Sequence, residues 1–596
     1  MKFKKFAQKL QKIEDTSSRN EMTDIIVEVI KSLSHEELKK VFYLIQGRVV
    51  PRYFPLEFNV ARKLMTRSLS DAYAKSVEDI QKLFSTIGDL GLLAEKLSKR
   101  KRCSLSILDV YQHLSQVASL EGKDSQLGKI KKISTLLKLC DPLSGKFVTR
   151  MILGKMRLGV SDKSILDALS IYVVGDKSYR KVLDRAYGIR GDIGYIAHRV
   201  ATKGIDALKK MKVQCGVPVA SMLCERESSV ESIFKRMDAF VLQPKYDGLR
   251  CQIHYRKKGF KKGVVSVGIK RSMMKELSEQ VRIFSRNQEN LTEMFPDIIK
   301  AIFSLRVSSI VVDSEAVGIN PKTGELAPFQ KTIQRRRKHN IKETSQNVPI
   351  RAFVFDILLL DDRDLTAKTL KERVAILDDV MRGSKSQKTV VKAPSLIINN
   401  MKSFDDAFSR LVLEGLEGVI VKGVDSIYEP GKRGYDWIKV KKSQRGHLID
   451  TIDAVVLGYY RGRGARARFG IGAILVGVYN KKDRSFETIA KVGTGIKDNE
   501  WKKIKITLDK NSIKKVPDDV SVKKNLVPDI WVKPSIITVV EADEMTKSPN
   551  HTAGSDGKRG YSLRFPRLKE FDRKDKTVDD ATTVEEVKNI FKSQKK

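Results

Sequence analysis

The stretch Gln243-Pro244-Lys245-Tyr246-Asp247-Gly248-Leu249-Arg250 decides the interpretation of this chain. It follows directly on the apolar run 240–242, so we expect a strand that ends at a lysine and continues into a tight Asp-Gly turn. A lysine amine is a nucleophile only when it is uncharged, and desolvation together with nearby cations lowers its pKa. Lys245 is therefore a candidate nucleophile. For the segment taken alone, an ordinary hairpin turn is the alternative.

Six further clusters of charged and aromatic residues follow, in an order that carries more information than any one of them. They are Ser285-Arg286-Asn287, Asp313-Ser-Glu315, Phe353-Val-Phe355-Asp356, Glu414 to Lys422, Arg433 to Lys441, and Ser562-Leu-Arg564-Phe565-Pro566-Arg567. Most of them adjoin short β-branched runs, which places their polar residues at or near strand ends. Cations in such numbers suit a triphosphate, and paired carboxylates suit magnesium.

This ordered set resembles the covalent nucleotidyltransferase superfamily, and most closely the ATP-dependent DNA ligases of archaeal and eukaryotic type. The likeness covers nearly the whole chain. It implies that Lys245 attacks the α-phosphorus of ATP, expels pyrophosphate and carries AMP. The AMP then passes to the 5′-phosphate at a nick in duplex DNA, and attack by the 3′-hydroxyl seals the strand and releases AMP. Such chemistry needs mainly positioning and neutralisation of charge.

The resemblance also implies roles for individual residues. Arg250, Lys422, Lys439 and Lys441 would neutralise the triphosphate, Glu315 and Glu417 would face Mg²⁺ or the ribose, and Arg286 would contact ribose or phosphate. Phe355 would stack on the adenine, Arg433 would act in the later steps on DNA, and Arg564 and Arg567 would orient pyrophosphate. For each residue alone the structural alternative is simpler: a phenylalanine in an apolar strand is usually core, and a glutamate often caps a turn.

One position departs from the family pattern. Two residues before the nucleophile the family usually has a glutamate that faces the adenine amino group, whereas this chain has Gln243. The amide oxygen accepts a hydrogen bond as a carboxylate does, but the amide NH₂ donates to a different base. We expect ATP, and Gln243 leaves ADP and GTP as alternatives.

A second part of the resemblance concerns duplex DNA. Phe329 and Phe565 match a pair of aromatics that press into the minor groove on either side of the nick, and apolar wedges beside cations distort duplexes. Arg335 belongs to a basic run, 335–339, that resembles the family's DNA-reaching loop. The alternative for this run is a solvated, charged helix end.

The length of 596 residues and the changes in pattern along the chain predict a multidomain protein. Helical periodicity predicts an all-α DNA-binding domain over 1–212, and short β-branched runs between helices predict an α+β nucleotidyltransferase domain with a mixed sheet over 213–443. Short strands with glycine-rich turns predict a C-terminal OB-fold β-barrel over 444–596.

Net charge points to the partner. The formal charge of +42 is spread over all three predicted domains, and 114 basic against 72 acidic residues is not the balance of a hot-habitat surface. A polyanion contacted by every domain explains this excess, so nicked double-stranded DNA is the expected partner. A sliding clamp is a further partner that the resemblance implies, although we find no convincing clamp-binding peptide.

The remaining features favour a cytoplasmic enzyme of prokaryotic type, associated with the nucleoid. No window approaches 18 apolar residues, no secretory or organelle signal is evident, and five scattered cysteines contain no C-x-x-C pair. We expect a monomer that acts in DNA replication, repair and recombination. An RNA ligase or capping-type guanylyltransferase is the alternative enzyme, and a non-catalytic DNA-binding scaffold is the alternative of another class. The long basic helical region argues against the first, and the intact motifs argue against the second.

Overall fold

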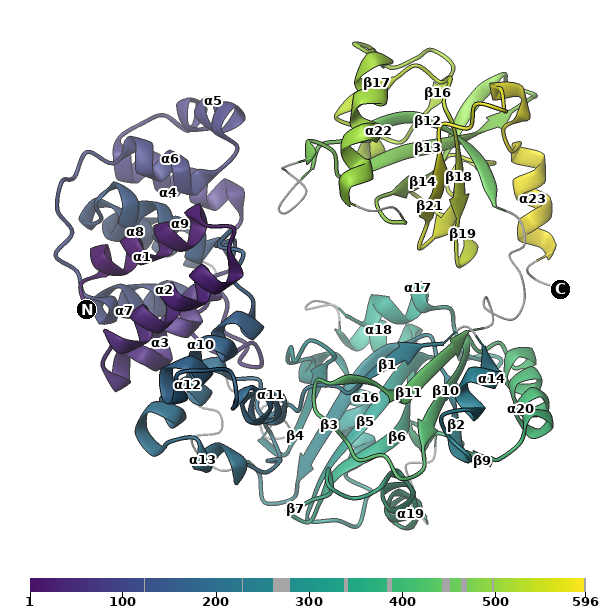
Figure 1. Ribbon diagram of the computed structural model, residues 1–596, viewed down its shortest axis with the longest axis horizontal. Coiled ribbons are helices and arrows are strands. Elements are labelled where there is room, and N and C mark those ends of the chain that lie inside the picture. The colour runs from purple at the N-terminus through teal and green to yellow at the C-terminus, as the bar shows by residue number, and fades with distance from the viewer. Residues whose placement is uncertain are drawn as a thin grey trace. The chain divides into compact units, whose positions relative to one another are not determined.

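The computed structural model describes residues 1–122, 124–227, 229–260, 279–336, 341–382, 388–441, 451–462, 469–495 and 498–593. The chain forms two compact units, Met1–Val440 and Lys441–Lys596. Helices occupy the N-terminal part of the first unit and two sheets occupy the rest of it (Figure 1). The predicted boundary at 212/213 stays a prediction, and the one at 443/444 lies outside the described residues.

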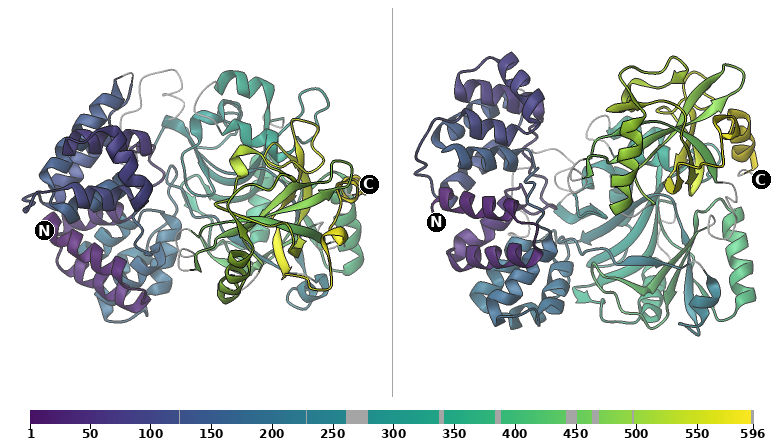
Figure 2. Two further views of the ribbon diagram at one scale, coloured as in Figure 1. Left: turned by 90° about the horizontal axis from the view of Figure 1, so that it is seen from above. Right: turned by 45° about the horizontal axis from the view of Figure 1, so that its top comes forward.

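The N-terminal region is all-helical, as predicted. Its helices pack on one another around one hydrophobic core that runs from Phe3 to Leu208 (Figures 1 and 2). They are α1 (Phe3–Asp15), α2 (Arg19–Lys31), α3 (His35–Ile45), α4 (Arg62–Tyr73), α5 (Val77–Ile87), α6 (Leu90–Leu97), α7 (Ile107–Ala118), α8 (Ser125–Leu139), α9 (Pro142–Ile152), α10 (Asp162–Val174), α11 (Arg180–Ile189), α12 (Ile193–Lys203) and α13 (Asp206–Lys209).

Local sequence explains where these helices begin and end. Ser34 and Glu37 form a reciprocal capping box at the start of α3, and Asp141 caps α9 just before its first-turn proline. Gly88 and Gly175 end α5 and α10 in the left-handed conformation, which glycine adopts without strain.

The central region contains two sheets. One has the order β1-β11-β10-β2-β9, and the other has the order β4-β3-β5-β6-β7 with β8 also paired to β6. Their strands are β1 (Leu223–Arg226), β2 (Phe240–Lys245), β3 (Leu249–Arg256), β4 (Val281–Ser285), β5 (Ser309–Gly318), β6 (Ile350–Leu360), β7 (Arg363–Asp364), β8 (Val390–Lys392), β9 (Leu396–Ile398), β10 (Gly418–Gly423) and β11 (Arg433–Lys441).

Short helices accompany these sheets. They are α14 (Val230–Phe234), η1 (Thr292–Met294), α16 (Pro296–Ile302), α17 (Phe329–Thr332), η2 (Ile333–Arg335), α18 (Ile341–Asn347), α19 (Leu370–Met381) and α20 (Met401–Leu413). Helix α20 packs on β10, and α19 packs on β6. Parallel and antiparallel pairs occur in both sheets, so the predicted mixed sheet is confirmed.

The second unit is strand-rich. Its main sheet contains β12 (Ile452–Tyr460), β13 (Ala473–Asn480), β14 (Ser485–Val492), β15 (Ser512–Ile513), β16 (Val520–Ser521), β17 (Ile530–Val532), β18 (Ile537–Glu541) and β21 (Arg567–Phe571), while β19 (Glu544–Ser548) pairs with β20 (Gly560–Arg564). The unit also contains η4 (Lys524–Leu526), η5 (Val578–Asp580), and two longer helices, α22 (Asp498–Lys510) and α23 (Val584–Ser593). Its core includes the fully buried Trp501.

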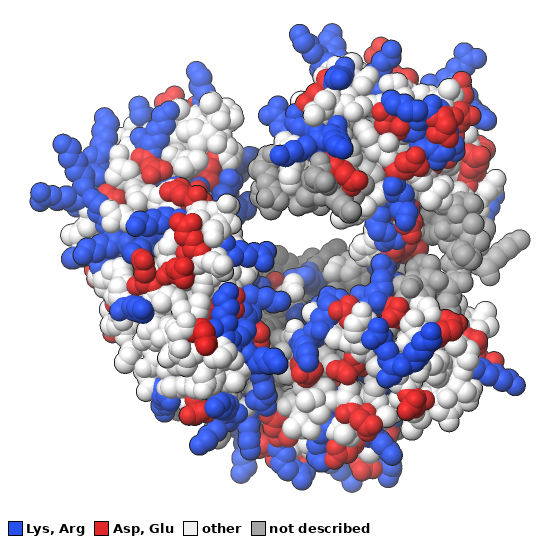
Figure 3. Space-filling view, in the orientation of Figure 1, with Lys and Arg blue, Asp and Glu red and all other residues white. Residues whose placement is uncertain are grey.

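Basic side chains are scattered over the face that Figure 3 shows, in the first and the second unit alike. Acidic side chains are interspersed among them, so the excess of +42 is distributed rather than gathered in one tail. Within the described residues, no helix has the length and apolar character needed to cross a membrane.

Candidate active site

A cleft of about 340 Å³ in the first unit lies against both sheets of the central region. Eight of the predicted site residues line it: Gln243, Lys245, Arg250, Arg286, Glu315, Phe329, Phe355 and Lys422. Three lining residues that we did not predict are Asn287, Arg336 and Trp437. The cleft therefore contains an amine, four further cations, one carboxylate and several aromatic rings.

Strand pairing positions the candidate nucleophile. Lys245 is the last residue of β2, and β2 runs antiparallel to β10, so that Lys245 lies opposite Gly418. The backbone N–H of Glu417 donates to the carbonyl of Lys245 at 3.2 Å, and the Glu417 carboxylate forms an ion pair with Lys245 Nζ. Glu417 thus holds the Lys245 amine in the cleft through an ion pair. The amine becomes a nucleophile only when this pair is released and the proton is lost.

The turn after Lys245 needs glycine for a steric reason. A Cβ at Gly248 would lie 2.5 Å from the carbonyl oxygen of Ala316 and 3.0 Å from Glu315 Cγ. This close approach lets β3 leave the turn directly beside β5. Arg250 then becomes the cross-strand partner of Glu315.

Arg250 is held by a buried acid that the sequence analysis quoted without a role. Its Nε and Nη2 donate to the two carboxylate oxygens of Asp313 at 3.1 and 2.6 Å. Tyr428 Oη donates to the same carboxylate at 2.9 Å and accepts from the backbone N–H of Met222 at 3.0 Å. Burial alone lowers the pKa of Arg250, but the charge of Asp313 outweighs it and the pKa is raised. Arg250 is a fixed cation on the wall of the cleft.

Lys422 is the buried cation of the cleft. Its Nζ lies 3.7 Å from the centre of the Trp437 ring and 4.6 Å from that of Phe355, and it donates to the Phe355 carbonyl at 3.4 Å. Burial lowers the pKa of Lys422 to about 8, and Asp356 only partly offsets the effect. A phosphate placed beside Lys422 would restore its charge.

The pKa of Glu315 is shifted in the opposite direction, away from the charged form by a rise rather than a fall. Burial raises the pKa of Glu315 to about 7, although Arg250 and Lys245 oppose the change. A cation placed next to this buried carboxyl group would stabilise its charged form. Because Mg²⁺ is bound in phosphate-transfer sites by one or two carboxylates plus substrate phosphates, Glu315 and Glu417 fit that donor set. Within the described residues no group of three or more acidic, histidine or cysteine side chains is arranged so that it could hold a metal ion by itself.

Gln243 has a defined orientation. Its amide Nε2 donates to the carbonyl of Phe355 at 3.1 Å and to Ser395 Oγ at 2.9 Å. A carbonyl oxygen only accepts, so the NH₂ group must face Phe355. The Oε1 atom is consequently left buried without a hydrogen-bond partner in the described structure. A buried acceptor without a partner in a cleft is free to accept a hydrogen bond from a ligand.

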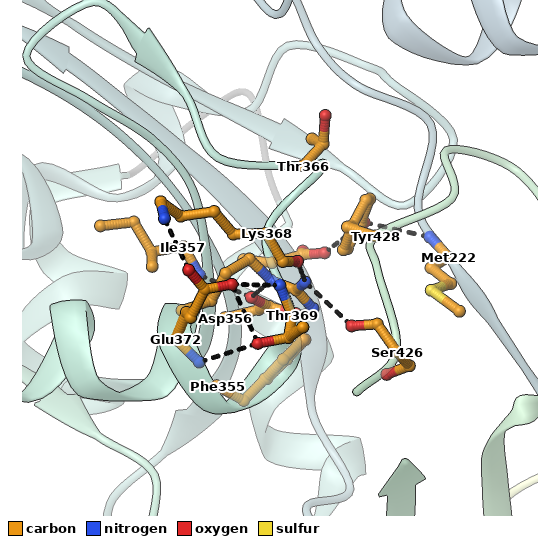
Figure 4. A network of polar contacts seen from close by, with 12 residues as sticks. Met222, Phe355, Asp356, Ile357, Thr366, Lys368, Thr369, Glu372, Ser426 and Tyr428 are labelled. Carbon is orange, nitrogen blue, oxygen red and sulfur yellow. Dashed lines mark hydrogen bonds and ion pairs between the residues drawn. The ribbon is translucent and has the colours of Figure 1, made fainter. Parts of the chain in front are cut away.

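A polar network behind the cleft holds Phe355. Asp356 directly follows Phe355 in the chain. The fully buried Arg373 donates to both carboxylate oxygens of Asp356, at 2.8 and 3.1 Å. Arg373 also donates to the carbonyls of Lys368 and Ser426. Figure 4 shows Asp356 among Thr369, Glu372 and Ser426, with Phe355 beside it. The network fixes β6 where Phe355 enters the cleft, and no single sequence motif revealed it.

Two of the predicted residues on β11, Arg433 and Lys439, do not line the cleft. Lys439 follows Trp437 by two positions, so both side chains leave the strand on the same face. Arg433 is exposed and donates to the carbonyl of Cys224, which itself lines the cleft.

The predicted residues Lys441, Arg564, Phe565 and Arg567 belong to the second unit. Asp543 accepts from Lys441 at 3.2 Å and from Arg567 at 2.6 Å. Arg564 pairs with Glu544, and Phe565 is 56% exposed with a positive φ of 53°. An exposed aromatic ring on a strained turn is available to a partner.

The structure corrects the prediction for Arg335. Its guanidinium is 2% exposed and binds both carboxylate oxygens of Asp297, at 2.9 and 2.8 Å, and the carbonyls of Val348 and Met294. Arg335 is therefore a core cation that ties η2 to η1 and α16, because it is buried and both of its Nη atoms donate within the protein. The neighbouring Arg336 is half exposed, pairs with Glu289 and lines the cleft. Charge along the run did not distinguish the two positions.

A strand-end lysine inside a cation-lined cleft can act as a nucleophile on a bound phosphate. Comparisons with known proteins agree. The chain matches three family models: DNA ligase N terminus over residues 2–170, ATP dependent DNA ligase domain over 270–441, and ATP dependent DNA ligase C terminal region over 467–576.

Similar proteins span the full chain. A protein named probable DNA ligase from Dictyoglomus turgidum is 41% identical over 100% of this chain and 98% of its own length. The DNA ligase of Saccharolobus solfataricus is 34% identical, again over 100% and 98%. A solved structure titled Pmar-Lig_PreS3 covers 95% of this chain and 98% of its own at a TM-score of 0.55 and 16% identity, which supports the fold. The chain belongs to the ATP-dependent DNA ligase family, whose general function is nick sealing.

Proposed function

We propose that Lys245 is the residue that carries AMP, and that the cleft around it performs the ATP-dependent step of nick sealing. The observation that carries this proposal is the position of Lys245 Nζ in the same cleft as Arg250, Lys422 and the orphaned acceptor of Gln243. Arg250, Arg286 and Lys422 neutralise the phosphates, and Phe355 stacks on the adenine. Lys439 and Lys441 add to this neutralisation, Arg433 acts in the later steps on DNA, and Arg564 and Arg567 orient pyrophosphate.

Glu417 has two successive roles in this proposal. In the free protein its carboxylate pairs with Lys245 and fixes the position of the amine. Glu315 and Glu417 would hold Mg²⁺, which would supply charge neutralisation at the phosphate oxygens. Release of Glu417 toward the metal would leave the Lys245 amine without its ion-pair partner.

The test of the nucleophile separates the steps of the reaction. Lys245→Ala abolishes formation of the AMP-protein adduct, because no other side chain replaces the amine, but it retains part of the sealing of pre-adenylated nicks. Both activities are measured on radiolabelled ATP and on synthetic DNA-adenylate. Unchanged adduct formation together with retained sealing would refute the assignment of Lys245.

We also propose that Gln243 selects ATP. Because Nε2 is bound to Phe355 and Ser395, the free Oε1 accepts from the adenine amino group, whereas guanine presents an oxygen at that position. Gln243→Leu raises the KM for ATP about tenfold and narrows the preference for ATP over GTP, as one missing buried hydrogen bond costs about 1 kcal/mol or more. Gln243→Glu retains the acceptor and serves as the control. Adduct formation with GTP alone contradicts the proposal.

The partner is nicked double-stranded DNA, with Phe329 and Phe565 as the apolar contacts beside the nick. We propose that the protein acts as a monomer in replication, repair and recombination, in the cytoplasm and on the nucleoid. The long helical region distinguishes this chain from RNA ligases and capping enzymes. Comparison of nicked DNA with nicked RNA as substrates tests this choice.

A further inference from the structure

A second cavity of about 440 Å³ lies in the first unit, between the last helices of the helical region and the end of β3. We call it the junction cavity. Its charged lining residues are Arg190, Arg199, Lys210, Lys212 and Arg256, with Asp362 as the one acid. None of the motifs of the nucleotide cleft contributes to it.

The charge of the junction cavity matches that of the nucleotide cleft. The nucleotide cleft is lined by five cations (Lys245, Arg250, Arg286, Arg336 and Lys422) and one acid, Glu315. The junction cavity is likewise lined by five cations and one acid, in a larger volume. In our proposal the nucleotide cleft faces a triphosphate. The junction cavity has the same excess of positive charge among its lining residues.

The cations of the junction cavity are poorly compensated. Arg256 forms an ion pair with Asp362, which removes the one acid that lines the cavity. Among the residues that the structure describes, Arg199, Lys210 and Lys212 form no ion pair. Several cations gathered without counter-charge repel one another, and a bound anion removes that cost.

Two arginines are pre-oriented in the junction cavity. The guanidinium carbon of Arg190 lies 3.9 Å from the centre of the Tyr195 ring, and Arg199 Nη1 donates to Tyr195 Oη at 3.1 Å. Arg199 Nε is fixed by the carbonyl of Ala207 at 3.3 Å. Arg190 Nε is buried with no hydrogen-bond partner in the described structure, and its nearest acid, Asp192, is 3.9 Å away. That acid is already hydrogen-bonded to Tyr43, Tyr53 and a backbone N–H.

We propose that the junction cavity is a second anion site, which binds a ligand with two or more adjacent phosphate groups. Arginine matches phosphate geometry through paired N–H donors, and flexible lysines at the rim add charge. One phosphate would leave most of the five cations unused. The ligand is either a free polyphosphate or two neighbouring phosphates of a DNA backbone, because both present the same chemistry.

The test is calorimetric titration of the full-length protein with sodium tripolyphosphate. Wild type binds at two sites, and Lys210→Gln with Lys212→Gln weakens one of them about tenfold, as loss of two contacts predicts. The matched control is Lys177→Gln with Lys203→Gln, which removes the same charge from two exposed positions of the helical region and leaves both sites intact. Equal binding by all three proteins overturns the proposal.

Two further readouts complete the experiment. Self-adenylation by ATP stays at the wild-type rate in the Lys210/Lys212 variant, which shows that the protein is folded and that the nucleotide cleft is intact. Failure of the junction site is therefore distinguishable from failure of the proposed function. Repeating the wild-type titration with saturating unnicked duplex assigns the source: loss of the second site identifies backbone phosphates, and its persistence identifies a free polyphosphate.

Discussion

Lys422 links burial to function at the scale of one residue. Its pKa of about 8 lies below the ordinary lysine value, so the fold favours the neutral amine, and the residue is protonated only below about pH 8. As the pH rises through 8, the KM for ATP increases because the cation that faces the phosphates is lost. Measured KM from pH 7 to 9.5 gives this profile in wild type and a flat one in Lys422→Arg, since arginine stays charged. A pH-independent KM in wild type contradicts the assignment.

The ordered motifs, together with the family resemblance that they carry, predicted much of the cleft, and the reasons for the gaps are physical. Lys245, Arg250, Glu315 and Phe355 were recognisable because each belongs to a motif in a fixed order. Ser395 and Arg373 were not, because they act through hydrogen bonds to Gln243 and Asp356 that form only after distant strands meet. Trp437 lies within the motif Arg433 to Lys441 but was given no role, because sequence does not tell which face of β11 enters the cleft.

At the scale of elements, two adjacent arginines at the end of η2 have different environments. Arg335 is buried, and Arg336 is half exposed. Arg335→Ala removes a buried ion pair and two carbonyl contacts between η2, α16 and the loop before β6, and it lowers the free energy of unfolding by about 3 kcal/mol. Arg336→Ala changes stability little, because exposed ion pairs contribute about 0–1 kcal/mol. Denaturant unfolding of the two variants measures the contrast. Equal losses would show that Arg335 does not hold these elements.

The periodicity of apolar residues predicted the individual helices and strands, but it did not predict which strands pair with one another. Alternating and β-branched runs predicted β2, β5, β6 and β10, and apolar spacing predicted the N-terminal helices. The order β1-β11-β10-β2-β9, which brings Glu417 next to Lys245 from 172 residues away, depends on long-range contacts that a local pattern does not encode.

For the whole molecule, charge is the dominant property. An excess of +42 spread over both units predicts that duplex affinity depends steeply on salt, because each neutralised phosphate releases counterions. With six or more phosphate contacts, affinity falls about a thousandfold between roughly 50 and 200 mM salt. Fluorescence anisotropy with labelled nicked duplex measures the slope, and Lys210→Gln with Lys212→Gln reduces it only if the junction cavity contacts the backbone. A salt-independent affinity contradicts an electrostatic origin of binding.

The most direct test of the account is where AMP becomes attached. We incubate the protein with ATP and Mg²⁺, digest it, and map the adduct by mass spectrometry. The account predicts one AMP on the peptide that contains Lys245, and none after the same treatment of Lys245→Ala. An adduct on a different lysine, or equal modification of the two proteins, contradicts it.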